Sequence, residues 1–191
     1  NQMIARGGLV AGAAFDDGFS SVRHRLVSSA EELPALRTSK YAQSDIEPEI
    51  FRGIERALAQ GRPVLFSGCP CQVAGLHLFL HKESPDLLTC ALACHGIPSP
   101  GWFFRYREQC NAARQAPVVA FSFRDKTNGW KKFQVRQALQ DGRVIQEPFA
   151  RNFFMWSFLH NLCLRQTCHA CRYKGENIPS DLILADFWGV E

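Results

Sequence analysis

The chain has 191 residues, of which 46% are hydrophobic and 21% charged, so it is long enough and apolar enough to fold around its own core. The net charge of +4 is small and scattered, which argues against nucleic-acid binding, and no apolar run approaches the roughly 18 residues of a membrane span. The eight cysteines, with no secretion signal at the start, favour a cytoplasmic protein with metal or redox chemistry over a disulfide scaffold.

The first third of the chain predicts a β-hairpin followed by a helix. The apolar run "LVAGAAF" (9–15) is typical of a buried strand, and Asp16-Asp17-Gly18 is a turn signal before a second strand over 19–27. Arg23 and Arg25 alternate with His24, which is typical of a strand with one solvated face. Apolar residues at helical spacing then predict an amphipathic helix that ends at Gly61: Ile46, Ile50, Ile54 and Leu58.

The middle of the chain predicts a βαβ unit. A short apolar strand over 63–68 is followed by a helix over 70–82, with Pro70 in its first turn, and by a second apolar strand over 87–94. The two strands of such a unit run parallel and end at the same edge of the sheet. This edge is where open α/β sheets place their ligands.

The last part of the chain predicts a helix, a strand, a hairpin and an aromatic helix. Ser99 and Pro100 begin a helix that runs to about 112, "VVAFSFRDK" (118–126) is a strand, and a hairpin turns at Asp141-Gly142. A Phe- and Trp-rich helix over 152–162 follows. We therefore predict an α/β fold: a mixed sheet with a parallel βαβ core, helices on its faces and an added antiparallel hairpin.

The domain organisation follows from the same elements. We predict a single cofactor-binding region over 1–191, which is compatible with a subdivision into 1–115 and 116–191. Because the chain lacks an initiator Met and stops just after an apolar run, we expect it to be a piece of a longer protein.

The cysteines divide into two groups by their surroundings. Cys90, Cys110 and Cys163 lie within or beside apolar elements and are expected to be small core residues. Cys71 falls in the first turn of the 70–82 helix, where free backbone N–H groups favour a thiolate. The predicted metal ligands are the four cysteines that loops can bring together: Cys71, Cys94, Cys168 and Cys171.

The residues alone leave the identity of the centre open. Four thiolates suit either zinc or a 4Fe-4S cluster, and spacing does not decide between the two. Arg165, Arg172 and Lys174 surround the C-x-x-C pair and would offset the negative charge of a thiolate-ligated centre. A third alternative is a redox pair of free thiols in Cys69-Pro70-Cys71.

Five further segments make the pattern specific: "VLFSGCPCQVAGL" (64–76), "ACHGIPSP" (93–100), "FSFRDKTNGWKKF" (121–133), "LRQTCHACRYKG" (164–175) and "SDLILADFWGVE" (180–191). In this order they resemble the coenzyme F-420 hydrogenase/dehydrogenase beta-subunit family. "GLVAGAAFDDGF" and "LRTSKYAQSDI" also fit, so the resemblance covers essentially the whole chain.

This resemblance implies an iron–sulfur flavoprotein that carries a 4Fe-4S cluster and FAD. Its partners would be a ferredoxin or ferredoxin-like domain and a redox small molecule, such as the deazaflavin F-420. The family's cluster cysteines correspond to Cys71, Cys94, Cys168 and Cys171. Family members commonly have Thr where this chain has Cys69, so a fifth thiol is expected near the cluster as a neutral neighbour, an alternative ligand or a site of oxidation.

The candidate flavin site is built from polar and aromatic residues in these segments. Side-chain donors suited to a pyrophosphate are supplied by Ser39, Lys40 and Tyr41 and by Arg124, Asp125 and Lys126. Trp130 and Trp188 are candidates for stacking on a ring system. Arg124 and Asp125 could instead form a local ion pair, and the tryptophans could belong to the core.

The sequence is compatible with two functions. The first is an oxidoreductase that relays electrons between a 4Fe-4S cluster, FAD and a hydride acceptor or donor, with no side-chain nucleophile. The alternative is a non-catalytic module that binds a partner protein. In it, zinc or a cluster would only hold loops against the sheet. Neither the acceptor nor the oligomeric state follows from the sequence.

Overall fold

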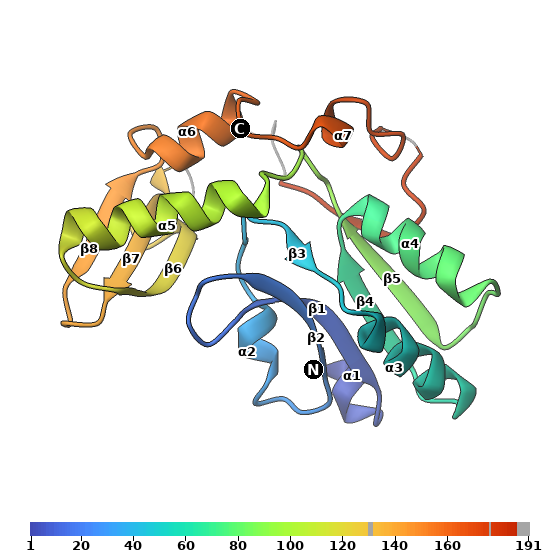
Figure 1. Ribbon diagram of the computed structural model, residues 1–191. Helices are drawn as coiled ribbons and strands as arrows, with labels where there is room; N and C mark the ends of the chain where they lie inside the picture. Colours follow the sequence, from blue (N-terminus) through green and yellow to red (C-terminus); the bar gives the residue numbers. More distant parts are fainter. Residues whose placement is uncertain (130–131, 176, 187–191) are drawn as a thin grey trace.

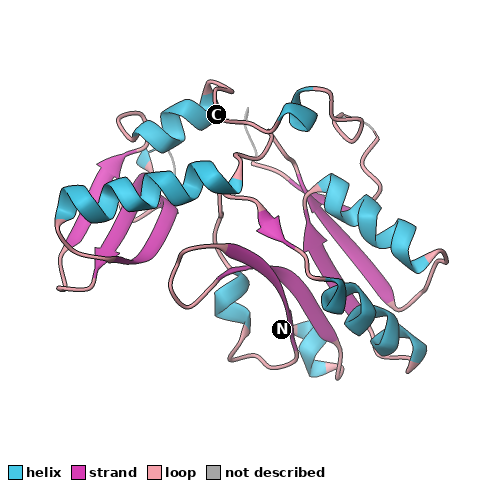
Figure 2. Ribbon diagram, in the orientation of Figure 1, coloured by secondary structure: helices cyan, strands magenta, loops and turns pink. Residues whose placement is uncertain are grey.

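The structure is a computed structural model that describes residues 1–129, 132–175 and 177–186. Two β-sheets with helices packed on them make up the molecule (Figures 1 and 2). The elements, in chain order, are α1 (Gln2–Ala5), β1 (Leu9–Phe15), β2 (Val22–Val27), α2 (Leu33–Leu36), β3 (Ser44–Asp45), α3 (Pro48–Ala59), β4 (Val64–Gly68), α4 (Pro70–Leu80), β5 (Leu87–Leu92), α5 (Pro100–Arg114), β6 (Val118–Asp125), β7 (Gln134–Leu139), β8 (Val144–Pro148), α6 (Phe153–Leu159), α7 (Gln166–His169) and β9 (Leu182–Leu184).

The larger sheet has six strands in the order β3-β2-β1-β4-β5-β9. β1 and β2 form the predicted antiparallel hairpin, whereas β1, β4, β5 and β9 are all parallel. The chain passes from β4 through α4 to β5, so the predicted mixed sheet with a βαβ core is confirmed. β4 and β5 therefore end at the same edge of the sheet.

The hairpin differs from its prediction at one end. β2 begins at Val22 rather than at residue 19, because the Asp16 carboxylate accepts hydrogen bonds from the backbone N–H groups of Ser20 and Ser21, at 2.7 and 3.1 Å. These bonds close a wider turn than the predicted Asp16-Asp17-Gly18 turn.

The larger sheet buries one face beneath α3 and α4. This core contains Ile54 of α3, Leu76 of α4 and Phe66 of β4, each fully buried. α2 packs against β1 from the opposite face, with its Leu36 next to Gly12. Because alternate residues of a strand face opposite sides, β1 can serve both layers.

The smaller sheet, β6-β7-β8, is antiparallel and separate from the larger one. The predicted hairpin at Asp141-Gly142 pairs with β6 and does not extend the larger sheet. α5 and α6 lie on this sheet (Figure 1), and their Phe103 and Phe154 are buried against Phe121 and Phe123 of β6. The predicted Ser99 cap of α5 is confirmed, since its hydroxyl accepts the N–H of Trp102.

Residues from before and from after residue 115 contribute to each of the two hydrophobic cores. Phe103, from before that position, lies in the core of the smaller sheet, and Ile178, from after it, packs on the core of the larger sheet. Phe15 at the end of β1 contacts Phe123 with ring centroids 6.5 Å apart, so a strand of the larger sheet also packs on the core of the smaller sheet.

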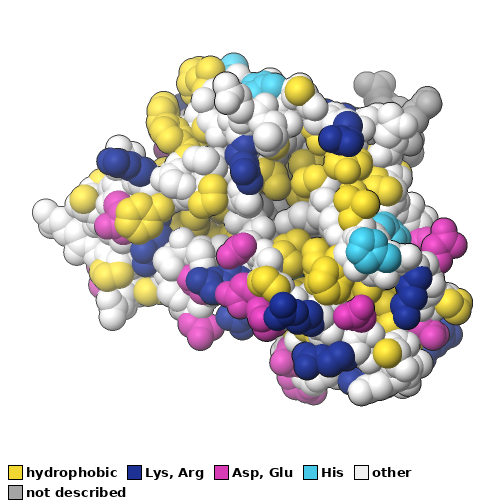
Figure 3. Space-filling model, turned by 45° about the vertical axis from the view of Figure 1, so that its right-hand side comes forward, with side chains coloured by type: hydrophobic (Ala, Val, Ile, Leu, Met, Phe, Trp, Pro, Cys, Tyr) yellow, Lys and Arg dark blue, Asp and Glu magenta, His cyan; other side chains and the backbone are white. Residues whose placement is uncertain are grey.

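The surface matches the scattered charge of the sequence. Acidic and basic side chains are interspersed over the face shown in Figure 3, with apolar side chains between them. Among the described residues, no helix combines the length and the apolar character needed to cross a membrane.

The edge strand β9 is held to β5 by a polar latch. The Asp181 carboxylate accepts the backbone N–H and the hydroxyl of Thr89, at 2.7 and 2.6 Å, and the Asp181 N–H donates back to that hydroxyl. The three side chains of β9 are exposed, so side-chain burial adds little to its attachment.

Replacement of Asp181 by alanine is expected to loosen β9, at a cost of about 1–3 kcal/mol, because Thr89 is fully buried and would lose its acceptor. The bonds from Thr89 lower the pKa of the Asp181 carboxyl, so this stabilisation is present above the unfolded-state pKa and is lost as the pH falls through the lower folded-state value. Amide hydrogen exchange of 182–184 measures the effect. Glu83→Ala, an exposed carboxylate deletion, is the control, and equal exchange in both variants would contradict the latch.

Candidate cofactor site

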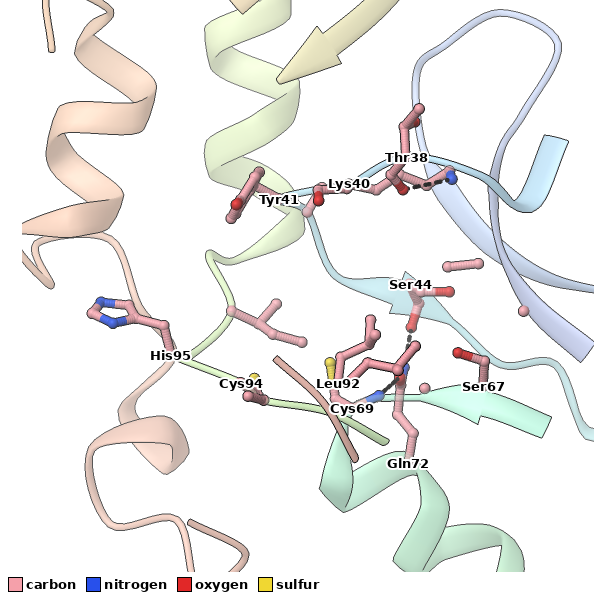
Figure 4. Close-up of a pocket in the computed structure, with 18 of the residues that line it drawn as sticks. Thr38, Lys40, Tyr41, Ser44, Ser67, Cys69, Gln72, Leu92, Cys94 and His95 are labelled. Atoms are coloured by element: carbon pink, nitrogen blue, oxygen red, sulfur yellow. Dashed lines mark hydrogen bonds between the residues drawn. The ribbon is translucent and has the colours of Figure 1, made fainter. Parts of the chain in front are cut away.

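A large cavity of about 630 Å³ opens at the edge where β4 and β5 end. Its wall includes Ser67, Gly68 and Cys69 from β4 and the start of α4, and the segment 92–98 that follows β5. α6 and the loop between α2 and β3 also line it (Figure 4), as do residues of β1, β2 and β6 and the segment 184–186. The prediction that this edge forms a ligand site agrees with the position of the cavity.

A second, small cavity of about 40 Å³ is lined by all four of the predicted cluster cysteines. Cys71 lies in the first turn of α4, Cys94 follows β5, Cys168 is in α7, and Cys171 lies just after α7. The structure therefore brings together thiols that are up to 100 residues apart in the sequence (171 − 71 = 100).

The segment with Cys168 and Cys171 is held against the loop after Cys94. The N–H of Arg165 donates to the Ile97 carbonyl at 3.0 Å, and Pro98 and Leu164 form an isolated β-bridge. Gly96 has a φ of +148°, and a Cβ there would lie 2.7 Å from a Leu164 methyl group. Glycine at 96 thus allows the close approach that gathers the cysteines.

The Cys71 thiol is affected by burial and by its three neighbours. Burial raises the pKa of the Cys71 thiol, and Cys94, Cys171 and Cys168 raise it further. The prediction that the helix N-terminus favours a thiolate at Cys71 is not met, because burial and these neighbours outweigh the backbone N–H groups.

Cys94 and Cys69 form a coupled pair of thiols. The hydrogen bond from Cys69 lowers the pKa of the Cys94 thiol to about 7, helped by the N–H of Gly96 and the charge of Lys174. The pKa of Cys69 is raised by the same hydrogen bond and by burial. Cys69 lines the large cavity and not the small one, which favours a neutral neighbour over a fifth ligand.

The other three cysteines lie outside both cavities. Cys90 is buried in β5, while Cys110 and Cys163 are partly buried against the core of the smaller sheet. Their prediction as small core residues is confirmed.

Four of the residues predicted for flavin binding line the large cavity: Ser39, Lys40, Tyr41 and Arg124. The Lys40 ammonium donates to the carbonyls of Arg37 and Thr38, at 2.7 and 3.3 Å, and burial lowers its pKa to about 8. An anionic ligand would compensate this loss of solvation.

The remaining residues predicted for flavin binding are placed elsewhere. Asp125 accepts the N–H of Thr127 at 3.1 Å and closes a turn, and Lys126 is exposed. Neither lines the large cavity. Trp130 and Trp188 lie outside the described residues.

Arg124 pairs with Asp186, not with Asp125. Its Nη1 lies 2.5 Å from the Asp186 carboxylate, and its guanidinium lies 4.8 Å from the centroid of the Phe133 ring. Arg124 comes from β6 and Asp186 follows β9, so the ion pair joins the two sheets at the cavity wall. The predicted alternative, a local ion pair between Arg124 and Asp125, was wrong, because the acidic partner of Arg124 is Asp186.

His24 and Ser44 in the cavity wall were missed by the sequence reasoning. His24 is 4% exposed and stacks on Phe66 with ring centroids 5.3 Å apart. Its Nδ1 lies 2.6 Å from Ser44 Oγ, and its Nε2 lies 3.1 Å from the Ser67 carbonyl. Alternation with Arg23 and Arg25 placed His24 on the inner face of β2, but it gave no indication of a cavity on that face.

The buried His24 makes folding stability depend on pH. Burial lowers its pKa from 6.5 to about 4, so between these values the unfolded chain binds a proton that the folded protein does not. Stability is expected to fall by roughly 3 kcal/mol as the pH drops from 6.5 to 4. Chemical denaturation across this range measures it. His24→Phe should flatten the slope, and an unchanged slope in that variant would contradict this assignment.

Comparison with known proteins was made on the sequence and on the fold. The family model that describes the C-terminal part of the coenzyme F420 hydrogenase/dehydrogenase beta subunit matches residues 61–190. A chain of the F420-reducing nickel–iron hydrogenase complex from Methanosarcina barkeri has a similar fold, with a TM-score of 0.56 and 15% identity. The similarity covers 94% of this chain and 60% of that chain, so this chain spans less than two thirds of that relative.

A search of curated proteins found no match. The family match nevertheless covers more than half of the chain and contains four of the five characteristic segments whole, together with the gathered cysteines. The chain therefore belongs to the coenzyme F420 hydrogenase/dehydrogenase beta-subunit family.

Proposed function

We propose that this protein is an iron–sulfur flavoprotein oxidoreductase that relays electrons between a 4Fe-4S cluster, FAD and a hydride acceptor or donor. The observation that carries this proposal is the shared wall of the two cavities. Cys94, Gly96 and Ile97 line both the small cavity with the four cysteines and the large cavity beside it. A cluster in one and a flavin in the other would be separated only by this segment.

The donor set of the small cavity fits an iron–sulfur cluster. Among the described residues, no three His, Cys, Asp or Glu side chains form a group that could hold a single metal ion. A zinc ion draws its four sulfurs to within about 2.3 Å of one point, whereas a cluster distributes its thiolates over several irons. The four cysteines around the small cavity supply the all-thiolate donor set that a 4Fe-4S cluster uses.

The large cavity fits a flavin nucleotide. Its volume of about 630 Å³ lies within the usual range for cofactor sites. Apolar side chains from α6, such as Met155 and Phe158, supply surface for a ring system, and Lys40 supplies a partly desolvated cation for a phosphate. Figure 4 shows Lys40 and Tyr41 on the side of the cavity away from Cys69.

The protein's own residues would position these groups and tune them. A cluster and a flavin together supply one-electron and two-electron chemistry. Cys71, Cys94, Cys168 and Cys171 would hold the cluster, and hydrogen bonds to the sulfurs, such as that from Cys69, would adjust its potential. The exposed Arg172 and Lys174 would offset the negative charge of the ligated centre.

The partners follow from this chemistry. A ferredoxin or ferredoxin-like domain would supply or remove single electrons, and a deazaflavin such as F-420 would exchange the hydride. Because its thiols must remain reduced to bind iron, we place the protein in the cytoplasm.

Anaerobic purification of the full-length protein tests the proposal. We expect a brown protein with iron, acid-labile sulfide and releasable FAD. A colourless protein with one zinc and no flavin would instead identify a metal-stapled docking module. A metal-free protein whose activity requires both Cys69 and Cys71 would identify a thiol oxidoreductase.

A further inference from the structure

The hydrogen bonds of His24 fix which of its nitrogens carries the proton. The Ser67 carbonyl, 3.1 Å from Nε2, can only accept a hydrogen bond, so Nε2 carries the hydrogen. Burial lowers the pKa of the ring to about 4, so it is neutral near pH 7 and Nδ1 is an acceptor. Ser44, with its Oγ 2.6 Å from Nδ1, must therefore donate its hydroxyl proton to His24.

This arrangement leaves Ser44 as a pure acceptor in the cavity wall. A hydroxyl has one proton and two lone pairs, and the proton of Ser44 is used by His24. Ser44 is 7% exposed and lines the large cavity. Within the part of the chain that the structure describes, Ser44 Oγ has no second hydrogen-bond partner. Its remaining lone pairs can accept a hydrogen bond from a ligand in the cavity.

Gln72 presents the complementary group next to Ser44. Its Oε1 accepts the N–H of Cys69 at 2.9 Å, and its Nε2 donates to the Ser44 carbonyl at 3.2 Å. These two bonds fix the orientation of the amide and leave one N–H of Gln72, which also lines the cavity. Figure 4 shows Ser44, Ser67 and Gln72 together beside Cys69.

We propose that this wall binds the imide edge of the redox ring, with Ser44 Oγ accepting the ring N–H and Gln72 Nε2 donating to the adjacent ring carbonyl. The proposal rests on the proposed function, since it assigns the ring end of the flavin to this wall. An imide presents a donor flanked by acceptors, which matches an acceptor beside a donor. Cys69 and Cys94 line the same cavity, so the ring would lie next to the cluster site, and Lys40 would remain for the phosphates.

His24 is a positioning residue in this scheme. It does not need to touch the ring, because it acts by holding the proton of Ser44 away from the cavity. Its stacking on Phe66 and its bond to Ser67 keep the imidazole in place. Without His24, the Ser44 hydroxyl could turn its proton toward the ring N–H and oppose binding.

The test compares FAD with FAD methylated at the imide nitrogen. Both are titrated into the flavin-free full-length protein with its cluster intact, and binding is followed by flavin fluorescence. The wild type is expected to bind FAD more tightly than the methylated analogue by about five- to a hundredfold, because methylation removes the donor to Ser44. Ser44→Ala should bring this ratio close to one, while Ser44→Thr, which keeps the acceptor, should preserve it.

Two further variants separate the hydrogen bond from steric effects. Ser67→Ala enlarges the same wall without removing the proposed acceptor, so the ratio should persist. His24→Phe should lower the ratio although it leaves Ser44 in place. A thermal unfolding scan of each variant confirms that it is folded.

A ratio near one in the wild type, or a ratio that survives Ser44→Ala, would overturn the imide contact while leaving the flavoprotein proposal intact. A ratio lost in Ser67→Ala but kept in Ser44→Ala would also overturn it, since the acceptor would then be Ser67. Failure of the wild type to bind either flavin would overturn the proposed function, and this inference with it.

Discussion

Cys94→Ala is expected to abolish cluster binding, with iron and acid-labile sulfide falling by more than about tenfold. Cys94 lines both cavities, so it would ligate the cluster and also separate it from the flavin. Alanine has no group that can bind iron, so the iron next to residue 94 would lose its thiolate ligand. The measurements are iron, sulfide and the visible spectrum of the protein purified without oxygen.

The strand that precedes Cys94 offers a matched control for this experiment. Cys90 is a buried thiol in β5, four residues before Cys94, and lines neither cavity. Cys90→Ala should retain the iron content and spectrum of the wild type. Cluster loss in both variants would indicate a general folding defect, and retention of a full cluster in Cys94→Ala would contradict the assignment of Cys94.

Phe123→Ala is expected to produce the largest loss of stability, about 3–5 kcal/mol. Phe123 is fully buried, with its ring centroid 5.3 Å from that of Phe154 and 5.9 Å from those of Phe103 and Tyr41. Its removal would leave a cavity among rigid aromatic rings that cannot close it. For a chain of this length, a decrease in Tm of roughly 10 °C or more is expected.

The effect should extend to the cofactor site, because Phe123 precedes Arg124 and contacts Tyr41, both of which line the large cavity. FAD binding should therefore weaken in this variant. Phe104, which is 53% exposed on α5, provides the control, and Phe104→Ala should change the Tm little. Similar decreases in both variants would show that Phe123 does not have the central packing role assigned to it.

Local patterns in the sequence predicted the elements that build the site. Apolar runs with turn signals located β4 and β5, Pro70 located the first turn of α4, and the parallel connection placed Cys71 and Cys94 at one edge. These predictions succeeded because a strand–helix–strand connection of this length has almost one geometry. Cys71 and Cys94 could be selected for the same reason, and Cys168 and Cys171 by their C-x-x-C spacing.

The walls of the large cavity depended on contacts that no local pattern specifies. The alternation of β2 showed that His24 faces inward. It did not show that the hydroxyl of Ser44, twenty residues later, would form a hydrogen bond with the His24 ring. Arg124 and its partner Asp186 are 62 residues apart and come from different sheets. Such pairs form only after whole elements have packed.

The sequence by itself therefore determined the α/β class and the βαβ unit, because apolar periodicity and strand order constrain the chain over short distances. It also indicated four cysteines, but only the tertiary structure shows that they line one cavity. Only the tertiary structure decided that the C-terminal hairpin joins β6 in a sheet of its own and that the two cavities share Cys94. It also decided which flavin candidates reach the cavity. Asp125 and Lys126 do not line it, because the turn after β6 directs them elsewhere.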